Sequence, residues 1–240
     1  MIRTVIFDID NTLYDYDTRH EAGYLALGRY ASGLYGISME EYDALYRESM
    51  KQIRDRVGET APVHSRAIRL QYFQQLLPGP HDFSEILNMY SAYWDAFLSD
   101  MKPFPDAIRF LGLLKEKNIR TGIGTDMTAH MQFKKLSLLG MDRYFDFVVT
   151  SEEAGEEKPG KKMFGLCLEK AGVPAGECMF IGDNPRKDIQ GALSAGMYAV
   201  YLNTKGAASV PEEILSGSQK QRFTEITSYA ELIDRWPEFT

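Results

Sequence analysis

Two carboxylates, two positions apart, follow the first apolar run of this 240-residue chain. The run Val5–Phe7 leads into Asp8, Ile9 and Asp10, with Asn11 as a turn residue after them. Side chains alternate between the two faces of a strand, so Asp8 and Asp10 can converge on one point only where the strand ends and the backbone turns. Two acids held that close repel each other unless a cation or a proton lies between them. The pair therefore indicates chemistry, although an acidic turn after a buried strand would give the same local pattern.

Three further features end apolar runs or precede helical patterns in the second half. They are Thr125 with Asp126, then Lys158 before Pro159, and then Asp183 with Asp188 five positions later. Each has a structural explanation when taken singly, because short acids cap helices and favour helix N-termini. A lysine among other lysines can simply be a solvated residue. Asp183, directly after a buried run, has the weakest such explanation.

Together, the four features predict a single site. In an open parallel sheet, ligands bind beyond the carboxyl ends of the strands, at the point where the strand order reverses. The site would combine acids, a hydroxyl and one ammonium, a set that suits a hard cation and a phosphoryl group. Mg²⁺ needs only one or two carboxylates and a phosphate oxygen, because it keeps several of its waters.

The elements that would position these residues alternate between strands and helices. Helical spacing connects Ala107 to Leu114 and Phe164 to Ala171, and Gly172 follows as a left-handed terminator. Strands alternating with such helices predict an α/β fold with a doubly wound, Rossmann-like parallel sheet. The predicted strands are Thr4–Phe7, Arg120–Gly124, Phe147–Thr150, Met179–Ile181, Ala199–Leu202 and Phe223–Ile226, with a loop over 204–218 and a terminal helix around Tyr229–Trp236.

The segment 15–103 has a different pattern and predicts an all-helical insertion. Helical spacing appears near 18–35, 39–57, 62–77 and 83–98, with no strand signal between them. Its aromatic residues fall at helical spacing and are interpreted as core filling. We therefore expect a core domain of residues 1–14 and 104–240 and a helical cap domain of residues 15–103, hinged at Tyr14–Asp17 and Asp100–Pro105.

Composition excludes several classes of protein. The net charge of −7 argues against a nucleic-acid partner, which would favour a basic face. No segment reaches the ~20 apolar residues that span a bilayer, and the N-terminus lacks the long apolar stretch of a secretory signal. Cys167 and Cys178 lie inside apolar runs and predict buried thiols in a reducing compartment. We expect a cytoplasmic protein with no membrane contact.

On these residues, the sequence resembles the haloacid dehalogenase-like hydrolase superfamily, in its phosphatase branch with a helical cap. The resemblance is carried by Asp8-Ile9-Asp10-Asn11-Thr12, Thr125, Lys158-Pro159, and Gly182-Asp183 with Asp188, in that order, and covers essentially the whole chain. Two positions depart from the family pattern, which often has Asn where this chain has Asp126 and Pro where it has Lys161.

The resemblance implies a role for each residue. Asp8 would attack phosphorus to form an aspartyl-phosphate, and Asp10 would serve as general acid and base. Related dehalogenases lack a second aspartate at this position, so Asp10 favours phosphoryl chemistry. Lys158 and Thr125 would hold the phosphoryl group, with Asp126 as a further substrate contact. The implied Mg²⁺ ligands are Asp8, Asp10 through its main-chain carbonyl, Asp183 and Asp188.

The resemblance leaves the substrate open. In layout the chain is most similar to pyrimidine 5′-nucleotidases and N-acylneuraminate-9-phosphatases, so we expect a small phosphate ester, a nucleotide or a sugar phosphate. Helical-segment residues that could reach the leaving group are Arg54, Arg56, His64 and Arg66, although solvated helix positions would explain each. A phosphomutase and a non-enzymatic switch that binds phosphometabolites are the alternative functions. Receiver domains of signalling systems are switches of this kind, but they are usually about half this length, so domain size counts against them. The oligomeric state stays open.

Overall fold

The computed structural model describes residues 1–58, 60–78, 81–215 and 217–239. The chain divides into two compact units, here called the core unit (Met1–Asp15 with Lys102–Thr240) and the helical unit (Tyr16–Met101). The predicted division at 14/15 and 103/104 falls close to these limits, but that the two units are independent domains stays a prediction. No helix among the described residues combines the length and the apolar character that crossing a membrane requires.

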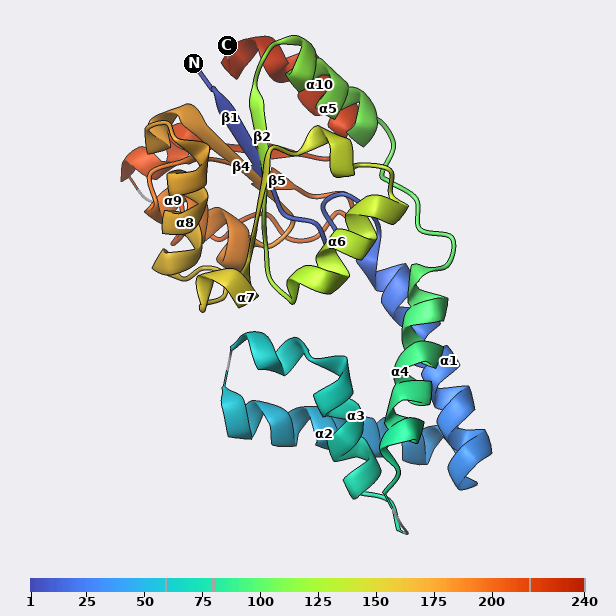
Figure 1. Ribbon diagram of the computed structural model, residues 1–240. Helices are drawn as coiled ribbons and strands as arrows, with labels where there is room; N and C mark the ends of the chain where they lie inside the picture. The colour runs from blue at the N-terminus through green and yellow to red at the C-terminus, as the bar shows by residue number, and fades with distance from the viewer. Residues whose placement is uncertain (59, 79–80, 216, 240) are drawn as a thin grey trace. The chain divides into compact units, whose positions relative to one another are not determined.

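The core unit is built on a six-stranded sheet whose paired strands are all parallel (Figure 1). The strand order is β3-β2-β1-β4-β5-β6, so the direction of winding reverses beside β1. This confirms the predicted Rossmann-like fold, and it places the ligand crevice beyond the carboxyl ends of β1 and β4. The strands are β1 (Thr4–Phe7), β2 (Arg120–Thr125), β3 (Phe147–Thr150), β4 (Cys178–Gly182), β5 (Tyr198–Leu202) and β6 (Phe223–Ile226).

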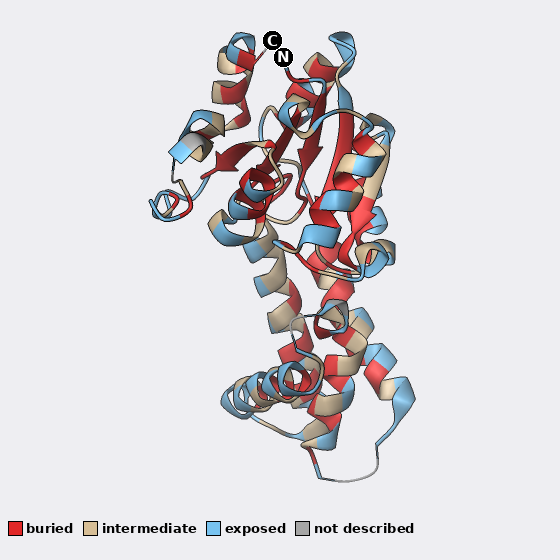
Figure 2. Cartoon of the chain, turned by 90° about the vertical axis from the view of Figure 1, so that its left-hand side faces the viewer, coloured by how far each residue is buried: buried red, intermediate tan, exposed pale blue. Residues whose placement is uncertain are grey.

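Helices cover both faces of this sheet, and the central strands are buried throughout (Figure 2). Ile6 on one face joins the cluster that contains Phe164 and Phe180. Phe7 on the other face packs edge-on against Phe110, with ring centroids 6.1 Å apart. A strand buried on both faces needs a continuous apolar run, which is why residues 4–7 carry no polar alternation apart from Thr4.

The helices of the core unit are mostly short. Helices α5 and α10 pack against each other, and α8 packs against β2, β3 and α9. The α-helices are α5 (Ala107–Glu116), α6 (Ala129–Leu138), α7 (Ser151–Ala154), α8 (Lys161–Ala171), α9 (Gln190–Ser194) and α10 (Tyr229–Arg235). Short 3₁₀ turns occupy Asp142–Tyr144, Ala175–Glu177, Gly217–Arg222 and Trp236–Phe239, and a π-helical turn occupies Pro185–Ile189.

One detail of the core unit differs from the prediction, and another falls partly outside the described residues. Asp188 does not begin an α-helix, because the Asn184 side chain accepts hydrogen bonds from the next backbone amides and winds a π-helical turn first. The loop predicted over 204–218 has no helix or strand in residues 204–215, and residue 216 lies outside the described residues. Cys167 and Cys178 are buried free thiols, as expected.

The helical unit contains four α-helices and a 3₁₀ turn among its described residues. Helix α1 packs along α4, and α2 packs against α3. The single helix predicted over 62–77 is wrong: a 3₁₀ turn with Pro62 in its first turn comes first, and Ser65 then caps a new helix through its hydroxyl. The elements are α1 (Tyr16–Tyr35), α2 (Met39–Val57), the 3₁₀ turn Ala61–His64, α3 (Arg66–Gln75) and α4 (Phe83–Leu98).

Candidate active site

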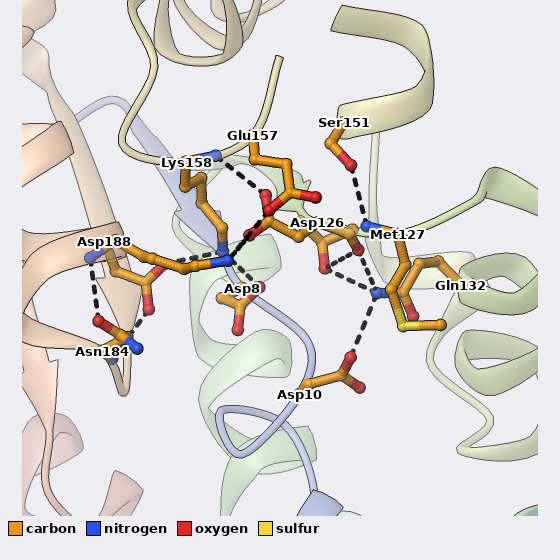
Figure 3. A network of polar contacts seen from close by, with 12 residues as sticks. Asp8, Asp10, Asp126, Met127, Gln132, Ser151, Glu157, Lys158, Asn184 and Asp188 are labelled. Carbon is orange, nitrogen blue, oxygen red and sulfur yellow. Dashed lines mark hydrogen bonds and ion pairs between the residues drawn. The ribbon is translucent and has the colours of Figure 1, made fainter. Parts of the chain in front are cut away.

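Asp8 is the first residue beyond β1 and is still tied to the sheet. Its backbone amide donates to the Ile181 carbonyl of β4 at 2.9 Å, and the residue is only 5% exposed. The Lys158 ammonium lies 2.6 Å from Asp8 Oδ1 (Figure 3). A nearly desolvated carboxylate is thus aimed beyond the edge of the sheet, with a single cation on one of its two oxygens.

Lys158 connects two acids of the site. Its Nζ also lies 2.7 Å from Asp188 Oδ1, and the residue is 4% exposed. Burial opposes the charge of the ammonium, but the Asp188 and Asp8 carboxylates outweigh burial and raise the pKa of Lys158 well above its ordinary value. Lys158 is therefore a permanent positive charge at the site.

Asp8, Asp183 and Asp188 converge from two adjacent strand ends. One carboxylate oxygen from each lies within 4.8 Å of the others. Gly182 makes this approach possible, because a Cβ at that position would lie 2.4 Å from the Asp188 carboxyl carbon. A chain without glycine at position 182 could not bring Asp188 this close to β4.

The acids of this cluster carry more negative charge than Lys158 balances. Burial, with Asp188 and Asp10 as negative neighbours, raises the pKa of Asp8 to about 7, even though Lys158 acts in the opposite direction. Burial and the Asp188 and Asp8 charges raise the pKa of Asp183 to about 8. A divalent cation among these oxygens would relieve the repulsion. The donors are all carboxylate oxygens, which fits Mg²⁺ and is unlike the nitrogen and sulfur donors that zinc prefers.

Asp10 lies apart from that cluster and has a cation of its own. The Lys135 ammonium donates to both of its carboxylate oxygens, at 2.7 and 2.9 Å. The Tyr14 hydroxyl donates to Oδ1 at 2.5 Å. The Lys135 side chain has no exposed surface, whereas that of Asp10 is 23% exposed. The second carboxylate is therefore held in one orientation while part of it stays accessible.

Lys135 and Gln132 were not singled out from the sequence. They lie three residues apart on the buried face of α6, where Met131 and Leu136 are the expected apolar residues. Polar residues within an apolar helical stripe were the available signal, because a buried lysine needs a partner. Gln132 Nε2 donates to Thr125 Oγ1 at 2.8 Å.

Thr125 and Asp126 lie at the end of β2, as predicted, but both side chains already have protein partners. Asp126 Oδ1 accepts from the Lys158 backbone amide at 3.0 Å, and Oδ2 pairs with the Lys187 ammonium at 2.8 Å. Burial alone would raise the pKa of Asp126, but Lys158 and Lys187 outweigh it and lower the pKa. Asp126 thus fastens the Lys158 loop to β2, and its predicted contact with substrate stays a prediction. Lys187, which was also not singled out from the sequence, balances the negative charge of Asp126. An asparagine at this position would carry no such charge.

The four helical-unit residues proposed as substrate contacts have different environments. Arg54 and Arg56 are exposed on α2, and His64 is half-buried. Arg66 is 6% exposed, so its interpretation as a solvated helix position is wrong. Its guanidinium instead lies 3.8 Å from the centre of the Tyr93 ring.

Comparisons with known proteins agree with this fold and site. A family model described as haloacid dehalogenase-like hydrolase matches residues 2–196. The chain is 33% identical to a ribulose-1,5-bisphosphate 5-phosphatase of Halopiger xanaduensis, over 98% of this chain and 99% of that protein. It is 32% identical to a glyceraldehyde 3-phosphate phosphatase of Methanopyrus kandleri, over 84% of each.

More distant similarities are consistent with these matches. A pyrimidine 5′-nucleotidase of Escherichia coli, of the class named from the sequence, is 27% identical over 83% of this chain and 85% of that protein. The crystal structure of a 2-haloacid dehalogenase from Pseudomonas syringae superposes with a TM-score of 0.75 at 22% identity, covering both chains completely. At that identity the likeness concerns the fold alone. The extent of the family match and the phosphatase relatives at 30% identity or more lead to one conclusion: the chain is an enzyme of the haloacid dehalogenase-like hydrolase family, in its phosphatase branch.

Proposed function

We propose that this enzyme hydrolyses a small phosphate monoester in a Mg²⁺-dependent reaction through an aspartyl-phosphate on Asp8. The observation that carries the proposal is the division of labour between the two acids at the end of β1. Asp8 lies among Lys158, Asp183 and Asp188, whereas Asp10 is oriented separately by Lys135. This arrangement supports a role for Asp8 as nucleophile and for Asp10 as acid and base.

The first half of the reaction would form the covalent intermediate. An oxygen of Asp8 attacks phosphorus, and the bond from phosphorus to the leaving oxygen breaks as the new bond forms. Asp10 gives its proton to the leaving oxygen, so that an alcohol departs rather than an alkoxide. Lys158, charged and buried against Asp8, stabilises the negative charge of the transferring group.

The second half would hydrolyse that intermediate. Asp10, now a carboxylate, takes a proton from water, and the resulting hydroxide attacks the phosphorus of the aspartyl-phosphate. Inorganic phosphate leaves, and Asp8 is regenerated as a carboxylate. Lys135 would keep Asp10 in place through both proton transfers, because it holds both oxygens. The proton taken from water restores Asp10 to its acid form for the next turnover.

The residues that would hold Mg²⁺ are Asp8 and Asp183, with Asp188 beside them and the Asp10 main-chain carbonyl as a further oxygen. When bound, the ion supplies positive charge that offsets the repulsion among these acids and polarises the phosphoryl oxygens. Asp188, paired with Lys158 and accepting from the Asn184 backbone amide at 2.9 Å, would fix the geometry of the other two.

The names of the relatives support a proposal for the substrate class. Those at 32–33% identity are named for a phosphorylated pentulose and a phosphorylated triose. We therefore propose a phosphorylated sugar of similar size, ahead of a nucleotide, because the nucleotidase relative is less similar at 27% identity.

Phosphate release tests the proposal. Ribulose 1,5-bisphosphate, ribulose 5-phosphate, glyceraldehyde 3-phosphate and a pyrimidine nucleotide would be compared with Mg²⁺ or with EDTA. Asp8→Asn should lower kcat by more than about 10³-fold, while Asp142→Asn, an exposed acid of the same unit, should retain wild-type activity. Equal activity of Asp8→Asn and wild type would contradict the assignment of the nucleophile, and full activity in EDTA would contradict the metal requirement.

A second assay separates hydrolysis from transfer. Glucose 1-phosphate with a hexose bisphosphate primer should yield free phosphate, because the relatives at 32–33% identity are named as phosphatases. Formation of glucose 6-phosphate in place of free phosphate would instead identify a phosphomutase.

A further inference from the structure

Two arginines of the helical unit are buried without a carboxylate partner. Arg66 is 6% exposed and Arg69 is 9% exposed, one helical turn apart at the start of α3. Neither makes an ion pair with any acid in the described part of the chain. Buried charges in proteins are normally paired, because desolvating an unpaired ion is expensive. The pair therefore lacks an electrostatic partner.

Their hydrogen bonds do not supply that partner. The Nη1 atoms of both arginines donate to the same acceptor, the Tyr46 hydroxyl. Arg69 Nη2 donates to the Val63 carbonyl at 3.0 Å. All of these acceptors are neutral, so two like charges share one phenol oxygen, and no acid among the described residues balances them.

The surrounding groups offer donors that lack acceptors. The Nε atoms of Arg66 and Arg69 and the indole Nε1 of Trp94 are buried with no hydrogen-bond partner among the described residues. The Tyr46 hydroxyl accepts from both arginines, and its own proton has no acceptor among the described residues. Guanidinium and indole nitrogens can only donate. Buried polar groups are nearly always satisfied, so this cluster points to an acceptor beyond the residues that the structure describes.

Aromatic rings confine these groups to a small volume. The Arg66 guanidinium carbon lies 3.8 Å from the Tyr93 ring centre and 5.9 Å from that of Trp94. Arg69 lies 5.8 Å from the Tyr46 ring centre. Ring faces attract a cation, but they neither neutralise it nor accept its in-plane N–H groups. Burial and the nearby charges of Arg66 and Arg69 lower the pKa of His20 to about 4, so the local field is positive.

We propose that Arg66 and Arg69, with the Tyr46 hydroxyl and the Trp94 indole, form a binding site in the helical unit for a phosphate-type oxyanion. A dianionic phosphate would neutralise both guanidiniums and accept the unpaired N–H groups, and guanidinium forks match its oxygens. The ligand is either free phosphate or the phosphate group of a small phosphate ester that binds the helical unit, and neither case rests on the proposed function.

Fluorine NMR observes this site directly. The chain has two tryptophans, Trp94 beside Arg66 and Trp236 in the core unit, so 5-fluorotryptophan labelling gives one resonance for each unit. Inorganic phosphate, titrated in EDTA, should shift the Trp94 resonance saturably. Absence of any shift at Trp94, with phosphate or with a sugar phosphate, would overturn the proposal.

Substitutions then assign the binding to the arginines. Arg66→Gln and Arg69→Gln should each weaken phosphate binding at Trp94 roughly 10–100-fold, as expected for loss of charged hydrogen bonds. Arg29→Gln, which removes an exposed arginine of α1, should bind as wild type does. Arg66→Lys keeps the charge without the Nε donor and covers the case in which Arg66→Gln does not fold, which circular dichroism reports. Unweakened binding in a folded arginine variant would overturn the proposal.

Competing titrations distinguish the two sources of the ligand. If the ligand is a small phosphate ester, ribulose 5-phosphate, titrated in EDTA, should shift the Trp94 resonance at lower concentration than inorganic phosphate does, and Arg66→Gln should weaken both shifts. If it is free phosphate, inorganic phosphate should be the tighter ligand of the two. Should the protein prove not to be a phosphatase, the fluorine titration still decides whether the site exists.

Discussion

Replacing Lys135 with methionine should leave the nucleophile intact and disable the second acid. Methionine fills the space of the lysine stem but removes the ammonium from both oxygens of Asp10, at 2.7 and 2.9 Å. Truncating one partner of a fully buried ion pair costs about 3–5 kcal/mol. Asp10 is 23% exposed and keeps its bond from Tyr14, so we expect a smaller loss of about 1–3 kcal/mol in the free energy of unfolding.

The kinetic effect should depend on the leaving group. Positioned general acids and bases contribute about 10²–10⁴-fold, and Lys135→Met retains Asp10 in a looser position, so we expect kcat on a sugar phosphate to fall about 10–100-fold. A p-nitrophenolate leaving group needs no proton, so only the second step should then be slowed. Rapid mixing of Lys135→Met with p-nitrophenyl phosphate should therefore show a burst of about one p-nitrophenolate per enzyme, followed by slow turnover.

Two further variants show whether the effect arises from the contact between Lys135 and Asp10. Lys134→Met removes an exposed lysine from the adjacent position of α6 and should behave as wild type in urea unfolding and in turnover. Asp10→Asn should reproduce the burst. If Asp10→Asn lost activity while Lys135→Met kept the full kcat on sugar phosphates, Lys135 would be a structural residue, and the reasoning from its contacts would be refuted.

Further predictions concern the neighbourhood of the site and the core. Asp126→Asn keeps an acceptor for the Lys158 backbone amide but loses an ion pair with a partly exposed lysine; urea unfolding should show a loss of about 1 kcal/mol or less, and a large loss of kcat would instead indicate contact with substrate. Burial raises the pKa values of Cys167 and Cys178 to about 12 and 11, so both stay protonated at pH 8 and iodoacetamide should label them only after unfolding. Gly191→Ala would place Cβ 2.1 Å from an aromatic carbon, whereas Gly165→Ala meets nothing within 4 Å. The first should lower Tm and the second should leave it unchanged or raise it, as scanning calorimetry would show.

The strands of the core unit could be predicted because their signal is local. Residues 4–7 and 178–182 are buried on both faces, and a continuous apolar run is the pattern that such burial requires. The helix predicted over 62–77 was wrong because two local signals compete there. Pro62 suits the first turn of a helix, but the Ser65 hydroxyl caps a later start, and only the surrounding packing selects between them.

The residues of the candidate site also fall into those that the sequence could predict and those that it could not. Asp8, Thr125 and Asp183 could be proposed because each ends a strand, and the carboxyl ends of parallel strands share one edge. Lys135 could not, because it meets Asp10 across 125 positions of sequence. The solvated interpretation of Arg66 was wrong for a similar reason, since helical spacing does not show that aromatic rings from another helix cover it.

The sequence by itself determined the order of the elements, the chemistry of the strand ends and the helical nature of the insertion, because these depend on neighbours a few residues apart. Tertiary structure decided which charges meet. It paired Lys158 with Asp8 and Asp188, Lys135 with Asp10, and Lys187 with Asp126. Among the described residues, no acid pairs with Arg66 or Arg69. The physical reason is that pairing energies depend on distance and burial, and both are set only when distant segments pack together.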